Sequence, residues 1–397
     1  MFHFGGKNSG PVYGALIDIG SGSIGVAVVV SDPEKKLPQL LFARRINMRV
    51  SERSTEKTES VRRIKEALLS ASLTLSQEGY QALTASAPHA KITKLYVTCT
   101  SPWSFTISRN VHYENETPFK ITPELMEDLV QSAESEMFTQ LDSQSHLSEA
   151  GFEVVERATV DVLVNDYRII NPLNVTGTTL SLSHIAGLVP KEILTGVYEV
   201  QDKLFPNTEL HTHTYMLAMY CVMRDIFPNM HSSCIIDVTG EAIEFGIVEN
   251  NLLIENTFIP NGSSSFMREV SEKTGKPSSD ILTRMRSFGE EGDKLSTELK
   301  EYIEMYVEYV VQGLNTILEH RILPSDIIIT AHQSYEKLFK FIIEEALRRV
   351  KPSTSRIILV DQSIVEQITE GSDGDVYLAL GAGFFHKLHG GGEAKGD

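Results

Sequence analysis

The chain has 397 residues, of which 41% are hydrophobic and 22% charged, so it suits a globular protein of two or three domains and excludes wholesale disorder. A formal net charge of −17 repels phosphate backbones, and nucleic-acid binding is therefore not expected. The arginine pairs Arg44-Arg45 and Arg348-Arg349 are expected on solvated surfaces.

Cysteine usage and apolar patterning point to the cytoplasm. The three cysteines share no metal-like spacing and fit reduced thiols. Residues 1–7 lack the charged-then-apolar layout of a signal peptide. The longest apolar stretch, residues 12–30, carries Asp18 and several glycines, so it predicts a buried strand-turn-strand rather than a membrane span. We expect a cytoplasmic protein that meets a membrane only through partners.

In chain order, the first half of the sequence alternates strands and helices. After a hairpin at residues 16–29, apolar spacing predicts a helix over 60–75, a loop over 84–89 and a strand over 92–99. Thr122 and Pro123 are a helix start, and the helix is expected to reach about residue 137. A polar loop over 142–149 precedes strands at 152–164, 167–170 and 178–187, and a helix over 191–204.

The second half repeats this alternation. A hairpin at residues 235–248 and a strand at 252–259 come before helices over 266–274 and 298–318. The remaining expected elements are a strand at 327–330, a helix over 335–350, a strand at 356–360 and a small-residue helix over 376–385. The glycine-rich end, residues 389–397, is expected to be a disordered tail.

The two hairpins resemble each other without a gap. Residues 16–29 and 235–248 each contain an apolar run that ends in an aspartate, a turn of small residues and a second apolar run. Asp18 and Asp237 occupy the same place in the two copies. The pattern indicates an internal duplication and an α/β protein of two similar halves.

Two such hairpin tips that face each other across a cleft suit a polyphosphate ligand. Small turn residues let backbone N–H groups approach phosphate oxygens, and hydroxyl groups add donors. An aspartate beside phosphate requires a cation, so Asp18 and Asp237 are expected to act on Mg²⁺ through its waters.

The first tip resembles the first phosphate loop of the actin/Hsp70/sugar-kinase superfamily. Within this superfamily the chain is similar to the FtsA/PilM family of bacterial actin-like proteins, because residues 92–187 resemble the small extra (SHS2-type) domain of that family, with an Asn171-Pro172 turn and Gly177. The resemblance covers residues 12 to about 388. It implies an actin-like, ribonuclease H-like fold with a nucleotide cleft and an inserted small α+β domain.

The resemblance also implies domain boundaries. The first half is expected to comprise residues 12–90 and 191–233, interrupted by an interaction domain at 91–190. The second half is expected at residues 234–388, with a helical subdomain at 265–325.

By the same resemblance, ATP and Mg²⁺ are the expected cofactors. The residues that the family pattern assigns to the nucleotide are Asp18, Gly20, Ser21, Gly22 and Ser23 in the first loop, Asp237, Thr239, Gly240 and Glu241 in the second, Asp280 and Arg284 at the ribose, and Ala331, His332, Gln333 and Ser334 at the base.

The chain departs from the family pattern in two loops. In the second loop, glycines and threonines are usual where this chain has Thr239, Glu241, Ala242 and Ile243. In the third loop, Ala331-His332 replaces a glycine pair. Side chains there restrict backbone approach, and Glu241 adds a negative charge. Nucleotide binding with weak or absent hydrolysis is therefore the expectation, and no catalytic residue is assigned.

Three functions compete. The first is a scaffold most like FtsA in cell division, which recruits and tethers partners at the inner membrane and forms oligomers or filaments. The second is a PilM-like cytoplasmic component of type IV pilus assembly, which binds the cytoplasmic tail of a membrane protein. The third, a sugar-kinase-type enzyme, is disfavoured because the insert resembles an interaction domain.

Overall fold

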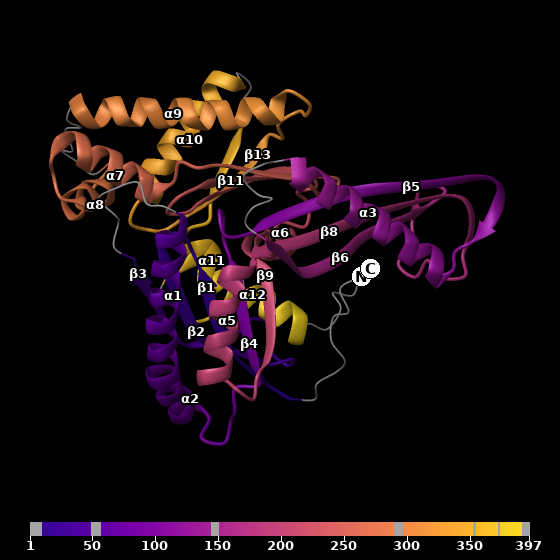
Figure 1. Cartoon of the computed structure of the whole chain (residues 1–397), viewed down its shortest axis with the longest axis horizontal. Coiled ribbons are helices and arrows are strands. Elements are labelled where there is room, and N and C mark those ends of the chain that lie inside the picture. Colours follow the sequence, from indigo (N-terminus) through magenta and orange to yellow (C-terminus); the bar gives the residue numbers. More distant parts are fainter. Residues whose placement is uncertain are drawn as a thin grey trace.

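A computed structural model describes residues 10–48, 57–143, 151–289, 297–351, 355–371 and 374–390. Two α/β halves are each built on a five-stranded sheet, and a third sheet of four strands extends away from them (Figure 1). Within these described ranges, no helix is long and apolar enough to span a bilayer.

The sheet of the first half combines an antiparallel meander with parallel strands. Its order is β3-β2-β1-β4-β9, in which β1, β2 and β3 are antiparallel and β4 and β9 run parallel to β1. The strands are β1 (Val12–Ile19), β2 (Ser23–Ser31), β3 (Gln39–Asn47), β4 (Lys94–Cys99) and β9 (Glu209–Thr214).

The sheet of the second half has the same order and the same strand directions, β12-β11-β10-β13-β14. Its strands are β10 (Ser233–Val238), β11 (Ile243–Glu249), β12 (Leu252–Ile259), β13 (Asp326–Ala331) and β14 (Arg356–Leu359). The duplication predicted from the two hairpins is therefore confirmed for the whole sheet.

The duplication reaches individual hydrogen bonds. Asp18 lies opposite Thr98 of β4, and the Thr98 hydroxyl donates to its carboxylate at 3.0 Å. Asp237 lies opposite Thr330 of β13, and the Thr330 hydroxyl donates to its carboxyl group at 2.6 Å. Each hairpin thus presents a buried aspartate that a threonine of the neighbouring parallel strand holds in place.

Helices cover the outer face of each sheet. On the first half, α1 (Lys57–Thr74) and α5 (Lys191–Leu204) pack on the alternate residues Ala15, Ile17 and Ile19 of β1, and η1 (Leu75–Gly79) leads into α2 (Tyr80–Ser86). On the second half the outer helices are α7 (Ser263–Thr274), α8 (Ser278–Arg286), α9 (Thr297–Leu318) and α10 (Glu336–Val350).

The core between the halves is built by α6 (Tyr215–Ile226), α11 (Gln362–Ile368) and α12 (Val376–His389). Their buried side chains join residues of both sheets, such as Leu16 of β1 and Ile235 of β10, in one apolar cluster. Helix α12 packs on α6, β1 and β2, and small residues such as Ala379 and Ala382 permit this close approach. A continuous core of this kind fixes the two sheets relative to each other.

The insert is an antiparallel sheet with a helix across it. Its order is β5-β8-β6-β7, and α3 contacts β5 and β8. The elements are β5 (Phe105–Lys120), α3 (Pro123–Ser143), β6 (Phe152–Val164), β7 (Tyr167–Arg168) and β8 (Thr176–Pro190). As predicted, α3 begins at Pro123, and the Leu125 N–H donates to the Thr122 hydroxyl at 3.2 Å.

Most predicted elements are confirmed, and the differences lie at the ends of helices. The loop expected over 84–89 is helical to Ser86. Helix α3 continues to Ser143, into the polar loop expected over 142–149, and residues 144–149 of that loop lie outside the described part of the chain. The tail expected from residue 389 is wrong at its start, because α12 includes His389, whose ring packs 4.7 Å from that of Phe385. Residues 391–397 lie outside the described ranges.

Candidate functional site

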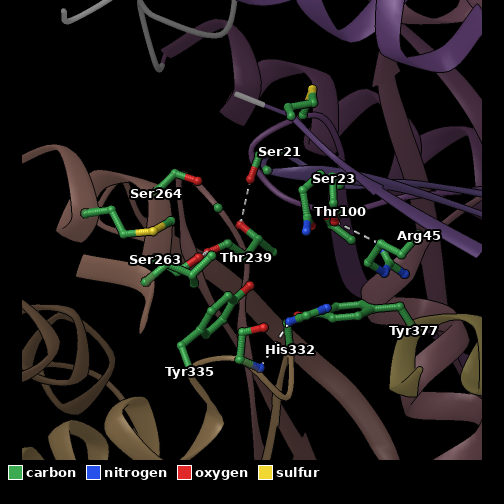
Figure 2. A pocket seen from close by; sticks show the side chains of 18 of the residues that line it. Ser21, Ser23, Arg45, Thr100, Thr239, Ser263, Ser264, His332, Tyr335 and Tyr377 are labelled. Atoms are coloured by element: carbon green, nitrogen blue, oxygen red, sulfur yellow. Dashed lines mark hydrogen bonds between the residues drawn. The ribbon is translucent and has the colours of Figure 1, made fainter. Parts of the chain in front are cut away.

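The tips of the two hairpins touch each other. The Ser21 hydroxyl donates to the Thr239 hydroxyl at 3.0 Å (Figure 2). The Glu241 N–H donates to the Ser21 hydroxyl at 2.8 Å. Gly22 and Gly240 are in backbone contact, since a Cβ added to Gly240 would lie 2.6 Å from the Cα and N of Gly22. No space for a phosphate group separates the two tips at this point.

Several backbone donors of the tips are also engaged. The Gly20 N–H donates to the Ser23 carbonyl at 3.0 Å, and the Thr239 N–H donates to the Ala242 carbonyl at 2.9 Å. The Ala242 N–H donates to the Thr239 hydroxyl at 3.2 Å. These are the N–H groups that a phosphate loop would otherwise offer to its ligand.

Glu241 turns away from the first hairpin. Its carboxylate accepts from the Ser265 hydroxyl at 3.0 Å and pairs with Arg268 of α7 at 2.8 Å. The first N–H groups of α7, those of Ser263 and Ser264, donate to the carbonyls of Thr239 and Gly240. The second loop therefore caps α7, and this helix terminus has no free donors there for an anion.

Asp18 forms a buried ion pair that the sequence did not predict. One terminal nitrogen of Arg45, Nη2, donates to Asp18 at 2.9 Å and to Asp375 at 3.0 Å, and Nε donates to Asp375 at 2.7 Å. Nη1 donates to the Ser23 hydroxyl at 3.0 Å, and the guanidinium carbon lies 4.9 Å from the centre of the Tyr377 ring. The Arg45 side chain is 7% exposed, so its expected place on a solvated surface is wrong.

Strand register explains how Arg45 reaches the site. Gly25 of β2 lies between Asp18 of β1 and Arg45 of β3, because it is paired with both. A Cβ at Gly25 would lie 2.6 Å from an Arg45 nitrogen, so only a residue without a side chain lets the guanidinium cross β2.

These contacts shift the pKa values of Asp18 and Asp375. Burial acts to raise the pKa of Asp375, but Arg45 and the Leu378 N–H hold it below its ordinary value. Burial raises the pKa of Asp18, and Arg45 opposes this shift. Arg45 thus opposes the effect of burial on both carboxyl groups, and the resulting pKa shift is downward at Asp375 and upward at Asp18.

The second hairpin carries two buried acids, Asp237 and Glu244. Asp237 is fully buried, and its second carboxyl oxygen has no hydrogen-bond partner. Glu244, paired with Asp237 across the hairpin, is 1% exposed, and both of its carboxyl oxygens lack a partner. Burial raises the pKa of Glu244 to about 7 and that of Asp237 well above its ordinary value. Glu244 is therefore mostly neutral at slightly acidic pH, and burial favours the protonated form of Asp237 as well.

The third predicted loop follows β13. The His332 ring is mostly buried, and burial together with the nearby Arg45 lowers its pKa to about 4, so it is neutral at physiological pH. The Arg286 side chain of α8 donates to the Ser334 hydroxyl at 3.2 Å. Ala331 is buried at the end of β13, and its side chain faces the core of the second half.

These loops surround a cavity of about 200 Å³. A smaller cavity of about 150 Å³ lies beyond Arg45 and His332, which line both. Of the predicted residues, those that line the larger cavity are Asp18, Gly20, Ser21, Gly22, Ser23, Thr239, Gly240, His332 and Ser334. Gln333 lines only the smaller one.

The remaining predicted residues lie elsewhere. Asp280 and Arg284 are exposed on α8, whose cavity-lining residues are Ser278, Ser279 and Leu282. Asp237, Glu241 and Ala331 do not line either cavity. Sequence analysis missed Arg45, Tyr335 and Tyr377 at the cavity, since none belongs to a loop motif; the glycine at position 25 was the available signal for Arg45.

The residues present do not fit magnesium-bound ATP in this arrangement. Asp18 is bound by Arg45 and Thr98, and Asp237 is fully buried and bound by Thr330, so neither carboxyl group is open to the waters of a metal ion. The cavity is also smaller than the roughly 300–1,000 Å³ typical of cofactor sites. Within the described residues, no group of three potential metal ligands is found.

Comparisons with known proteins support the fold. No family model and no curated protein matches the chain. It is similar to a solved structure of a PilM–PilN type IV pilus biogenesis complex, with 11% identity, a TM-score of 0.57, and coverage of 95% of this chain and 98% of that one.

Two other solved structures are more distant. One is the ethanolamine utilization protein EutJ from Carboxydothermus hydrogenoformans (9% identity, TM-score 0.44, 97% and 92% covered). The other is a Bacteroides thetaiotaomicron protein with an actin-like ATPase fold and unknown function (12%, 0.40, 90% and 93%). The chain thus has the duplicated, actin-like α/β fold that its two hairpins predicted.

Proposed function

We propose that this chain is an actin-fold adaptor that recruits a protein partner to a membrane-associated machine, in the manner of PilM. The observation that carries this proposal is an exposed apolar cluster on the insert, which we call the insert tip. It consists of Tyr167, Ile170 and Leu173, which are 75%, 74% and 49% exposed. Large apolar side chains gathered in one exposed segment are typical of protein-binding surfaces.

The site of the insert tip supports a recruiting role. It follows β6 and joins β7 to β8, at the end of the insert sheet that lies away from the two halves (Figure 1). Asn165, Asp166 and Asn174 take left-handed backbone conformations around it, with φ of 49°, 66° and 68°. Turns of this kind hold the apolar side chains on a defined backbone, which lowers the entropic cost of binding.

The similarity to PilM supports the pilus alternative more than the division scaffold. The solved PilM structure is a complex with PilN, so a protein of this fold binds a protein partner. A metabolic kinase needs an open cleft and an ionised base next to its substrate. Neither acid at the hairpin tips is available as such a base.

The test uses synthetic peptides that correspond to the cytoplasmic tails of inner-membrane proteins of the same organism. Each peptide is titrated calorimetrically into the purified chain. We expect one tail to bind and the double variant Tyr167→Ser/Ile170→Ser to weaken it at least about tenfold. Ile322→Ser, which changes an 85% exposed side chain between α9 and β13, is the control and should bind normally.

The identity of the captured tail separates the two machines. A pilus-assembly tail supports the PilM-like function, and a division-ring protein that needs the same tip assigns the chain to cell division instead. Sedimentation of the chain alone tests whether it also forms oligomers or filaments. If every tail bound the double variant as well as the wild type, the insert tip would not be the recruiting surface.

A further inference from the structure

The cleft already contains a cation. Arg45 crosses β2 above Gly25 and places Nη2 within 3.0 Å of both Asp18 and Asp375. In an actin-type cleft an ion between carboxylates would balance the charge of the phosphates. Here a guanidinium that belongs to the chain lies between the two carboxylates and binds both.

Little positive charge is left for a triphosphate. Among the described residues that line the larger cavity, Arg45 is the one cationic side chain, since His332 is neutral at physiological pH. Arg286 does not line the cavity, and its side chain donates to the Ser334 hydroxyl. Arg45 itself is shared by two carboxylates. A ligand with three or four negative charges in the larger cavity would face Asp18, while the cation of the lining is already paired with two carboxylates; that repulsion is strong where water is scarce.

The hairpin tips close the remaining space. Ser21, Thr239 and the Glu241 N–H form one hydrogen-bonded chain between the halves, and Thr239 also donates to the Ser101 carbonyl at 3.0 Å. A polyphosphate between the tips would have to break these bonds and separate Gly22 from Gly240.

From these contacts we propose that Arg45 is a built-in cation of this cleft and takes the place of magnesium, so the two halves remain in contact without nucleotide. The inference goes beyond the recruiting function, which does not depend on it. It assigns the chain to actin-fold proteins that work as fixed scaffolds rather than nucleotide-driven switches.

The first test needs no variant. The purified chain is titrated with Mg-ATP and with Mg²⁺ alone, by calorimetry and by thermal unfolding. We expect no saturable heat at roughly millimolar ligand and no shift of the unfolding midpoint, because a ligand that binds the folded state would raise it. Micromolar binding of Mg-ATP to the wild type would overturn the proposal.

The second test removes the internal cation. Arg45→Gln leaves two facing carboxylates around one vacated point, which is a site suited to Mg²⁺. We expect the unfolding midpoint to fall by roughly 10 °C and to recover in part with millimolar Mg²⁺, whereas the wild type does not respond. Arg44→Gln is the matched control, since Arg44 is about half exposed and pairs with Glu78 on the surface.

The outcomes separate a built-in cation from an ordinary buried ion pair. Rescue of Arg45→Gln by Mg²⁺, without an effect on Arg44→Gln, supports the proposal. A folded Arg45→Gln protein that ignores Mg²⁺ would overturn it, because the carboxylates would then not form a cation site. If Arg45→Gln does not fold, the wild-type titration alone decides.

Discussion

Glu244 offers a sharp test of the electrostatics of the cleft. Its carboxyl group is fully buried on β11, beside Asp237 and without a hydrogen-bond partner. Burial raises its pKa from 4.5 to about 7 in the folded protein. Glu244→Gln removes the ionisation and keeps the size and polarity of the side chain, so it isolates the cost of the buried charge.

The sign follows from linkage. A carboxyl group with a raised pKa binds its proton more tightly in the folded state, so the free energy of unfolding is highest where both states are protonated. It falls as the pH rises from 4.5 towards 7 and then levels off. A rise of this size corresponds to a loss of about 3 kcal/mol in the wild type, and the glutamine variant does not suffer this loss.

Denaturant unfolding, followed by circular dichroism across a pH series, measures the effect. We expect the free energy of unfolding of Glu244→Gln minus that of the wild type to increase by about 2 kcal/mol between roughly pH 5.5 and pH 8. Glu249→Gln, at the half-buried end of the same strand, is the control and should follow the wild type. A difference that stayed constant across the series would refute the reasoning, because Glu244 would then be ionised or solvated in the folded state.

Further outcomes follow from packing. Gly25→Ala should destabilise the chain by about 1–3 kcal/mol in thermal or denaturant unfolding, since its Cβ would lie 2.6 Å from Arg45. Gly240→Ala should lower the free energy of unfolding by a similar amount, because its Cβ would meet the backbone of Gly22. Gly10→Ala is the control and should have no effect, since nothing lies near its Cβ. Equal effects of all three substitutions would contradict the argument. A thiol reagent should leave the native chain unlabelled while it fully modifies the denatured chain, because burial raises the pKa of each cysteine and shields it: Cys99, Cys221 and Cys234.

Much of the fold is predictable because its strands and helices carry apolar side chains at regular spacing. The strand at Phe152–Val164 and the helix at Lys191–Leu204 match their predicted bounds for this reason. The strands β5 and β9 were not predicted. Half of β5 is exposed on the insert, and β9 buries polar residues such as Thr212 and His213, so neither shows the expected alternation.

The site was predictable only where it follows the backbone. The hairpin tips and the loop after β13 come from local sequence, and the structure brings Ser21, Thr239 and His332 to one cavity. Arg45 and Asp375 depend instead on strand register and on the entry of α12, which join residues far apart in the chain. Local pattern cannot reveal such a contact, because nothing in the sequence around Arg45 marks it as buried.

Divergence between the duplicated halves explains why this cleft differs from a symmetric phosphate clamp. Gly25 and Glu244 occupy equivalent places in the two hairpins, and their partners on the third strand are Arg45 and Phe258. In the first half the missing side chain lets a cation reach the aspartate. In the second half a glutamate fills that place, and Phe258 lies 5.4 Å from Phe105 at the start of the insert.

The third-strand position opposite Gly25 or Glu244 therefore has a different role in each half. In the first half it is Arg45, which places a positive charge in the cleft. In the second half it is Phe258, which packs on the insert where β12 contacts β5. Because Asp237 has no cation and is buried, it contributes to the fold through Thr330 and not to a metal site. One tip is thus ion-paired and the other holds two buried acids, and this asymmetry favours a permanent contact between the halves over a ligand between them.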